Sequence, residues 1–167
     1  MNETIQSILT RKSVRKYEST PLTEEEMKLL LECADMAPSA ANRQSTKIVA
    51  TQNPELIGEV VAAFEHPFNY DAPCLIFLYS GAVGGERWRA FNAALAAENI
   101  SIAAVAMGLA TVQLGCIYDL MNGEKGEIFK EKLGIPADYR FELAISVGHG
   151  AEDPEPKKRN EGNTAIV

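Results

Sequence analysis

The sequence predicts a single α+β domain, and three stretches carry this prediction. Residues 73–79 form an unbroken apolar run after a proline, which is typical of a central strand buried on both faces. Residues 23–36 begin with a capping box, Thr23 and Glu26, and continue with apolar residues at helical spacing. Residues 86–107 form a long alanine-rich helix. A chain of 167 residues fits one domain, spanning 1–167.

The other elements follow from spacing, proline breaks and capping residues. Ile5, Ile8 and Leu9 have the i, i+3, i+4 spacing of a helix. Asp119 is expected to cap a later helix, and Gly134 is expected to end it. In chain order we expect a helix over 3–11, a strand over 46–51, a helix from 53–54 to 66–67, a short strand or turn over 111–116, a helix over 119–133 and a strand over 141–148.

The long helix over 86–107 is apolar over much of its circumference. Its large apolar residues mark one face, while the other faces carry mostly the small side chains of alanine. A helix of this kind is buried either in a core or at a subunit interface. The expected apolar face consists of Phe91, Leu95, Ile102, Val105 and, just beyond the helix, Leu109.

Composition excludes several classes of protein. The formal net charge of −7 argues against nucleic acid and against a polybasic membrane surface as partners. No uncharged run is long and apolar enough to favour a membrane span, and the polar start of the chain does not resemble a secretion signal. Three widely spaced cysteines predict a reducing cytoplasm, and two histidines without partners at ligand spacing predict no metal site.

A cationic stretch at 11–17 is unusual for an acidic chain. If it is extended, Arg11, Ser13 and Arg15 lie on one face and Val14 lies on the other. Arginine guanidinium groups and a hydroxyl suit phosphate oxygens, because they offer several donors in fixed geometry. The alternative interpretation is a solvated basic helix end, where positive charge suits the helix dipole. A second cationic cluster occurs at 157–159.

A second candidate is the loop over 37–44. A proline break and small residues are followed by Asn42 and Gln44, whose amides each offer a donor and an acceptor. Small residues allow a planar ligand to approach the backbone. The alternative is an ordinary turn. Neither a Rossmann fingerprint nor a phosphate-binding P-loop occurs in the sequence.

Taken in order, these pieces resemble the nitroreductase family of FMN-dependent oxidoreductases. Residues 11–17 resemble its R-R-S-x-R-x-[FY] signature, and residues 37–44 resemble its A-P-S-x-x-N-x-Q loop. The alanine-rich helix running into 107–111 and the strand 145–148 followed by 157–159 complete the resemblance. It implies a three-layer α/β/α fold with a mixed, mostly antiparallel central sheet flanked by helices.

The resemblance also implies a homodimer with FMN at the interface and residues of both subunits in each site. The C-terminal tail, about 151–167, is expected to pack on the partner subunit. Arg15 would lie near flavin N1 and O2, and Gly115 near N5. The cofactor-binding residues are then Arg11, Ser13, Lys157 and Arg159 at the phosphate, with Lys12, Arg15, Gly115 and, from the partner, Ser39, Asn42 and Gln44.

By this resemblance the chain transfers a hydride from NAD(P)H through flavin N5 to a nitroaromatic, quinone or similar acceptor, in a ping-pong cycle. No catalytic side chain is expected, because the flavin carries the chemistry. The alternative is a flavin-binding carrier or sensor without reductase turnover, since Ser45 and Thr46 depart from the family pattern after Gln44. Trp88, beside the glycines at 81–85, either covers the flavin or belongs to the core, and Cys116 is expected to be a buried structural thiol.

Overall fold

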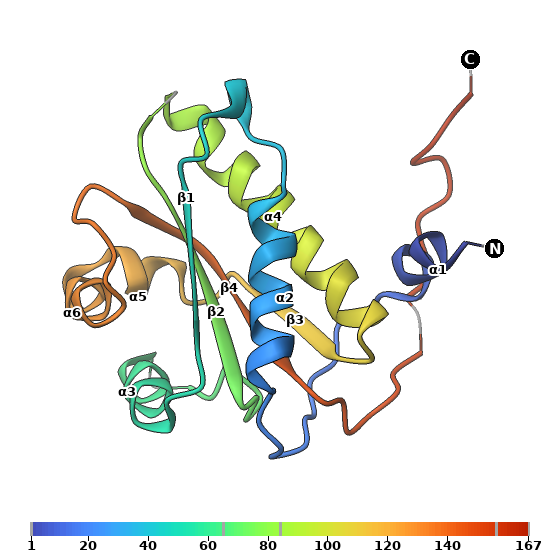
Figure 1. Ribbon diagram of the computed structural model, residues 1–167, viewed down its shortest axis with the longest axis horizontal. Coiled ribbons are helices and arrows are strands. Elements are labelled where there is room, and N and C mark those ends of the chain that lie inside the picture. Colours follow the sequence, from blue (N-terminus) through green and yellow to red (C-terminus); the bar gives the residue numbers. More distant parts are fainter. Residues whose placement is uncertain (1, 65, 84, 156, 167) are drawn as a thin grey trace.

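A four-stranded antiparallel sheet forms the middle layer of the molecule (Figure 1). The computed structural model describes residues 2–64, 66–83, 85–155 and 157–166. The strands are β1 (Thr46–Thr51), β2 (Cys74–Ser80), β3 (Ala110–Leu114) and β4 (Arg140–Gly148), in the spatial order β1-β2-β4-β3. Each pair of neighbouring strands is antiparallel, and a parallel pairing joins Ser13 to Thr111 as an isolated bridge. As predicted, β2 is central and buried along its whole length.

Helices cover both faces of this sheet, which confirms the three-layer arrangement (Figure 1). One face carries the second and fourth helices, and the other face carries the third, fifth and sixth. The helices are α1 (Glu3–Thr10), α2 (Glu24–Asp35), α3 (Pro54–Phe64), α4 (Arg89–Ala106), α5 (Tyr118–Asn122) and α6 (Glu124–Lys132), with short 3-10 turns at Ala40–Asn42 and Glu86–Trp88. The capping box of α2 is present as predicted, with Thr23 and Glu26 bonded to each other's backbone.

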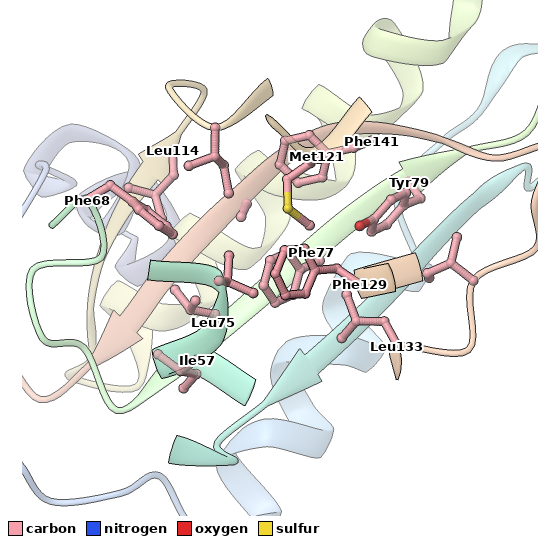
Figure 2. Close-up of a cluster of buried hydrophobic side chains, with 14 of the residues drawn as sticks. Ile57, Phe68, Leu75, Phe77, Tyr79, Leu114, Met121, Phe129, Leu133 and Phe141 are labelled. Carbon is pink, nitrogen blue, oxygen red and sulfur yellow. The ribbon is translucent and has the colours of Figure 1, made fainter. Parts of the chain in front are cut away.

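Aromatic residues fill the layer between the sheet and α3, α5 and α6 (Figure 2). Phe77 and Tyr79 of β2 and Phe141 of β4 are fully buried here, together with Met121 of α5. The rings of Tyr79 and Phe141 meet edge to face with centroids 5.4 Å apart. Large side chains are needed on this side because three short helices leave a wide space to fill.

Small side chains dominate the opposite layer. The face of α4 that packs on the sheet consists of Ala93, Ala96, Ala97, Ile100 and Ala104. The larger apolar residues that were expected to mark the apolar face within the helix are therefore not part of this core in the single chain. Phe91 is 53% exposed and Ile102 is half-buried, while Leu109 follows the helix and is buried. Alanines allow the helix axis to approach the sheet closely, and this turns the bulky residues outward.

The helix predicted over 119–133 is two helices. Gly123 adopts an extended conformation between α5 and α6. Gly126 then lies so close to the Met121 carbonyl that a Cβ would stand 2.2 Å from its oxygen. Asp119 lies inside the first turn of α5 and does not cap it. The close approach of α6 to the end of α5 thus depends on a residue without a side chain.

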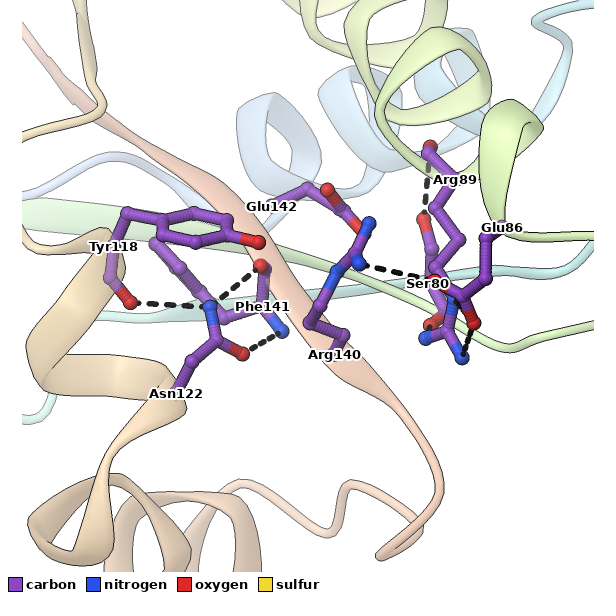
Figure 3. Close-up of polar contacts among 8 residues, drawn as sticks. All are labelled: Ser80, Glu86, Arg89, Tyr118, Asn122, Arg140, Phe141 and Glu142. Atoms are coloured by element: carbon purple, nitrogen blue, oxygen red, sulfur yellow. Dashed lines mark hydrogen bonds and ion pairs between the residues drawn. The ribbon is translucent and has the colours of Figure 1, made fainter.

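A network of charged side chains connects the start of α4 to the sheet (Figure 3). Arg89, which is buried, pairs with Glu86 at 2.9 Å and donates to the Ser80 carbonyl at 2.5 Å. Glu86 also pairs with Arg140, which pairs with the buried Glu142 at 3.1 Å. Burial raises the pKa of Glu142, and its bonds to Arg140 oppose that rise. The first turn of α4 is therefore held to the ends of both central strands.

Candidate functional site

The cationic stretch 11–17 runs as an extended segment along the edge of the sheet. The Val14 amide donates to the Thr111 carbonyl of β3 at 3.0 Å, and the Glu18 amide donates to the His149 carbonyl at 2.9 Å. Val14 is 6% exposed, while Arg15 is exposed on the other face. The alternation predicted from the sequence is therefore present, and the stretch also begins at the C-terminal cap of α1, Arg11, as the helix-end interpretation expects.

The two ends of the chain meet beside this segment. In Figure 1 the C-terminal tail passes next to α1, on the side of the molecule away from α3 and α6. A cavity of about 400 Å³ opens between them. It is lined by the cationic residues Arg11, Lys12, Arg15, Lys157 and Arg159, by Ser13, and by Ile8, Leu9, Pro154 and Glu155. Six of the ten predicted site residues thus share one cavity.

Carboxylates partly neutralise this cavity. Lys12 pairs with Asp153, and Arg11 pairs with Glu98 of α4 at 3.4 Å. The backbone amide of Arg15 donates to the Glu152 carboxylate at 2.6 Å. These contacts are exposed or partly exposed, so each contributes little to stability and is easily exchanged for another anion. Against five cationic side chains, one carboxylate residue, Glu155, lines the described part of the cavity.

Arg15 also lies over an aromatic ring that sequence reasoning missed. Its guanidinium carbon is 5.8 Å from the ring centre of Tyr70, and Tyr70 and Asp71 both have a φ of 55°. Asn69, Asp71 and Pro73 are typical turn residues, but nothing in the sequence indicates that this turn places Tyr70 under Arg15. Beneath it, burial raises the pKa of Tyr17, and the positive charge of Arg15 opposes that rise. Tyr17 therefore stays a neutral donor to the Val14 carbonyl, at 2.8 Å.

The loop 37–44 lies apart from this cavity in the same chain. Ala41, Asn42 and Gln44 have positive φ values of 53°, 52° and 50°. The Ser39 hydroxyl accepts the Gln44 amide at 2.9 Å and so closes the loop. The Gln44 side chain donates to Asn42 at 3.2 Å, and both side chains are exposed. The structure therefore gathers the three predicted loop residues into one group, with Asn42 and Gln44 exposed and Ser39 half-buried, away from the cationic cavity.

The remaining candidates lie at other places on the surface. Gly115 follows β3 with open space around its Cα, and it does not line the cavity. Cys116 is exposed, so the prediction of a buried thiol was wrong. Trp88 is half-buried and lies outside both hydrophobic clusters, with Arg87 stacked 4.3 Å from its ring centre. Of the two interpretations of Trp88, membership of the core is therefore wrong.

Two other features are absent from the described residues, a cluster of metal ligands and a helix that could span a membrane. No group of three histidine, cysteine or acidic side chains there could hold a metal ion. Within the same residues, each helix is too short or too polar to cross a membrane.

Comparisons with known proteins agree with this architecture. The chain is 28% identical over 182 residues to FMN reductase (NADPH) of Bacillus subtilis, covering 95% of this chain and 70% of that protein. It is 24% identical over 174 residues to NADPH-flavin oxidoreductase of Vibrio harveyi, with the same coverages. The crystal structure of a nitroreductase with bound FMN from Desulfitobacterium hafniense superposes with a TM-score of 0.91, at 24% identity and over 100% of this chain and 99% of that one.

The family model described as "Nitroreductase family" matches residues 8–66 and 59–149, which together span most of the chain. These residues include the cationic segment from Arg11, the loop 37–44 and all four strands. The chain belongs to the nitroreductase family.

Proposed function

We propose that this protein is an FMN-dependent oxidoreductase that passes a hydride from NAD(P)H to a small nitroaromatic or quinone acceptor. The observation that carries the proposal is the cavity in which the cationic residues of both chain ends converge. The relatives in Bacillus subtilis and Vibrio harveyi, which are named as flavin-dependent reductases, support the same activity. Because the three cysteines are unpaired, we extend the proposal to a reducing cytoplasm.

The chemistry of the cavity suits the phosphate of FMN. Arg11 offers a planar set of N–H donors, and Ser13 offers a hydroxyl on the same face of the extended segment. Lys157 and Arg159 would bind the same dianion from the tail. Glu98 and Asp153 pair with Arg11 and Lys12, and a doubly charged phosphate would compete well for these cations.

Bound FMN supplies the hydride chemistry, and the chain supplies orientation and charge. Arg15 would lie beside the ring at N1 and O2, where a fixed positive charge stabilises the negative charge that reduction adds. The ring of Tyr70 limits where the Arg15 side chain can go. Ser13 would hold the phosphate and Arg15 the ring, so residues of one extended segment would set the position of the whole cofactor.

We further propose that the working unit is a homodimer. Bulky apolar residues are exposed on α1, α2 and the outer side of α4, including Ile5 (49%), Leu29 (45%) and Phe91 (53%). A second copy of the chain that covered this surface would bring its loop 37–44 to the cationic cavity. Ser39, Asn42 and Gln44 would then act in the site of the partner, and Gly115 would present its backbone N–H near N5. The tail would complete the contact.

The direct test is flavin binding. Arg11→Ala should weaken FMN binding by about ten- to hundred-fold, because a charge-assisted hydrogen bond to phosphate contributes roughly 1.5–3 kcal/mol. Lys16→Ala is the matched control, since Lys16 lies in the same segment but does not line the cavity. Fluorescence titration of the apoprotein with FMN measures both. An Arg11→Ala protein that binds FMN as tightly as wild type would refute the phosphate assignment.

Turnover needs a second test. The flavin spectrum of the purified protein should bleach anaerobically with NADH or NADPH and return when 1,4-benzoquinone is added. The same experiment shows which nucleotide is preferred. A protein that holds FMN but never bleaches would instead be the flavin carrier or sensor.

A further inference from the structure

A buried amide connects α4 to the loop 37–44. Asn92 is 3% exposed, and its side-chain oxygen accepts the Ala40 amide at 3.0 Å. Ala40 immediately precedes the left-handed residues Ala41 and Asn42. No other side chain outside the loop is bonded to its backbone among the described residues. Asn92 is therefore the tether that joins this loop to the helix beneath it.

The loop needs such a tether because its backbone is strained. Left-handed φ values cost an alanine or a glutamine of the order of 1 kcal/mol each, whereas asparagine adopts them more readily. Ala41 and Gln44 both have such values, and both are exposed. Exposed residues have few packing contacts to hold an unfavourable conformation. Strain of this kind persists only where surrounding structure imposes it, and it is concentrated at functional sites.

The position of Asn92 is itself well defined. Arg89, one turn earlier in α4, is buried and bonded to Ser80 at the end of β2 and to Glu86 (Figure 3). The Gly81 amide donates to the Ser45 carbonyl at 2.8 Å, so the end of the loop is joined to the end of the same strand. The helix that carries Asn92 and the segment that follows the loop are thus both hydrogen-bonded to the end of β2. The space beside it is only about 30 Å³, too small for any ligand larger than water.

We propose that Asn92 is a positioning residue that holds loop 37–44 in its left-handed path and so sets where Asn42 and Gln44 meet the acceptor in the partner's flavin site. The effect of Asn92 on acceptor binding rests on the proposed function. The effect of Asn92 on the conformation of loop 37–44 does not, because it follows from the hydrogen bond to Ala40 alone. Loss of the tether frees the loop to relax to ordinary backbone angles, which moves both amides.

The test compares Asn92→Ala, Asn92→Asp and Asn99→Ala. Asn92→Asp keeps the oxygen that accepts the Ala40 amide. Asn99→Ala is the matched control, because Asn99 is a partly buried asparagine of the same helix that donates to the Cys33 carbonyl at 2.9 Å and does not touch the loop. Hydrogen–deuterium exchange of the apoprotein should show faster exchange across 40–44 in Asn92→Ala, by about ten-fold. Asn92→Asp and Asn99→Ala should exchange like wild type there.

Steady-state kinetics with 1,4-benzoquinone gives the second readout. Asn92→Ala should raise the KM for the quinone by about five-fold, as expected for a misplaced hydrogen-bonding group, and Asn92→Asp should restore it. The dissociation constant for FMN should rise as well, because Ser39, Asn42 and Gln44 of the same loop are proposed to reach the partner's flavin, and Asn92→Asp should restore it. Unchanged exchange in Asn92→Ala, or the same change in Asn99→Ala, would overturn the proposal.

Faster exchange without any change in KM would overturn the link to the acceptor. If Asn92→Ala does not fold, Asn92→Ser, whose shorter side chain loses the contact with the Ala40 amide, takes its place, and wild-type exchange at 40–44 in Asn92→Ser would refute the tether. A wild-type protein that binds no FMN would refute the proposed function, while the exchange experiment would still decide on Asn92.

Discussion

At the scale of single residues, Arg15 combines a charge with a defined position. It is exposed, yet its guanidinium lies over Tyr70 and its backbone amide is held by Glu152. A charge that is held in place acts on a nearby redox group more strongly than one on a free side chain, because less reorganisation is needed when the charge of that group changes. The position of Arg15 therefore bears directly on the proposed chemistry.

Arg15→Ala should lower the midpoint potential of the bound flavin, because a positive charge beside N1 favours the reduced, more negative ring. Arg15→Lys keeps a cation and should recover part of the difference. Spectroelectrochemical titration of the FMN-loaded protein measures each potential. A potential that is unchanged or higher in Arg15→Ala would show that Arg15 has no role at N1.

Tyr79 shows the opposite situation, a polar group without a partner. Its hydroxyl is buried among the aromatic residues of Figure 2, and no hydrogen bond to it exists in the described residues. Burial raises its pKa, with a smaller contribution from the charge of Glu127. The hydroxyl is therefore neutral and desolvated, which costs roughly 1–3 kcal/mol.

Tyr79→Phe should leave the free energy of unfolding unchanged or raise it by about 1 kcal/mol, because it removes an unsatisfied group and keeps the ring. Tyr17→Phe is the matched comparison. It removes a hydroxyl that donates to the Val14 carbonyl, so it should lower the free energy of unfolding by about 1 kcal/mol. Urea unfolding of the two variants at equal protein concentration distinguishes them, and a clear loss of stability in Tyr79→Phe would mean that the hydroxyl is satisfied.

At the scale of elements, α4 is defined by two different faces. Its alanine face packs on the sheet, and its outer face carries Phe91, Leu95 and Ile102. Both faces are apolar, so hydrophobicity alone does not distinguish them. The distance between the helix and the sheet distinguishes them. A helix whose inner side chains are methyl groups lies close to the strands and leaves no room for larger side chains.

Ala97→Leu should therefore destabilise the protein by about 1–3 kcal/mol, since Ala97 is fully buried against the sheet and a larger side chain would overpack this layer. Ala94→Leu, on the exposed side of the same helix, should change stability by less than about 0.5 kcal/mol. Urea denaturation provides the measurement. Equal effects at the two positions would argue against close packing of the alanine face.

At the scale of the whole molecule, exposed apolar residues gather on one side. α1, α2 and the outer face of α4 contribute Ile5, Ile8, Leu29 and Phe91, which are each between 45% and 53% exposed. α6, on the other side of the sheet, exposes Ile128 (58%). Apolar patches of this kind mark interfaces, whereas a single exposed isoleucine does not.

Phe91→Glu should convert the proposed dimer to monomers and weaken FMN retention with it, because each flavin site would be completed by the partner chain. Ile128→Glu introduces the same charge on α6 and should leave both properties unchanged. Analytical ultracentrifugation combined with the flavin-to-protein absorbance ratio tests the two variants. A Phe91→Glu protein that remains dimeric with full flavin content would place the interface elsewhere.

Much of the fold could be predicted from the sequence because its signals are local. The capping box at Thr23, the apolar run of β2 and the proline at the start of α3 each act within a few residues, and the structure confirms all three. The alternation around Val14 is equally local. Four pieces in the family's order identified the family: the motifs at 11–17 and 37–44, the alanine-rich helix running into 107–111, and the strand 145–148 followed by 157–159.

Other features depended on contacts between distant residues. The meeting of Arg11 with Arg159 depends on the path of β4 and of the tail behind it, which no short stretch of sequence encodes. The buried face of α4 was decided by packing distance, and the exposure of Cys116 by the course of the chain after β3.

By itself, the sequence determined most of the secondary structure, the family and the residue types available to bind a phosphate, but not the break between α5 and α6. Only the tertiary structure decided which charges share a cavity and which amide tethers the strained loop. The physical reason is the separation along the chain of the residues that interact. Helix caps, turns and alternation are interactions between neighbours in the chain, whereas a binding cavity and the Asn92–Ala40 bond join residues that only the complete fold brings together.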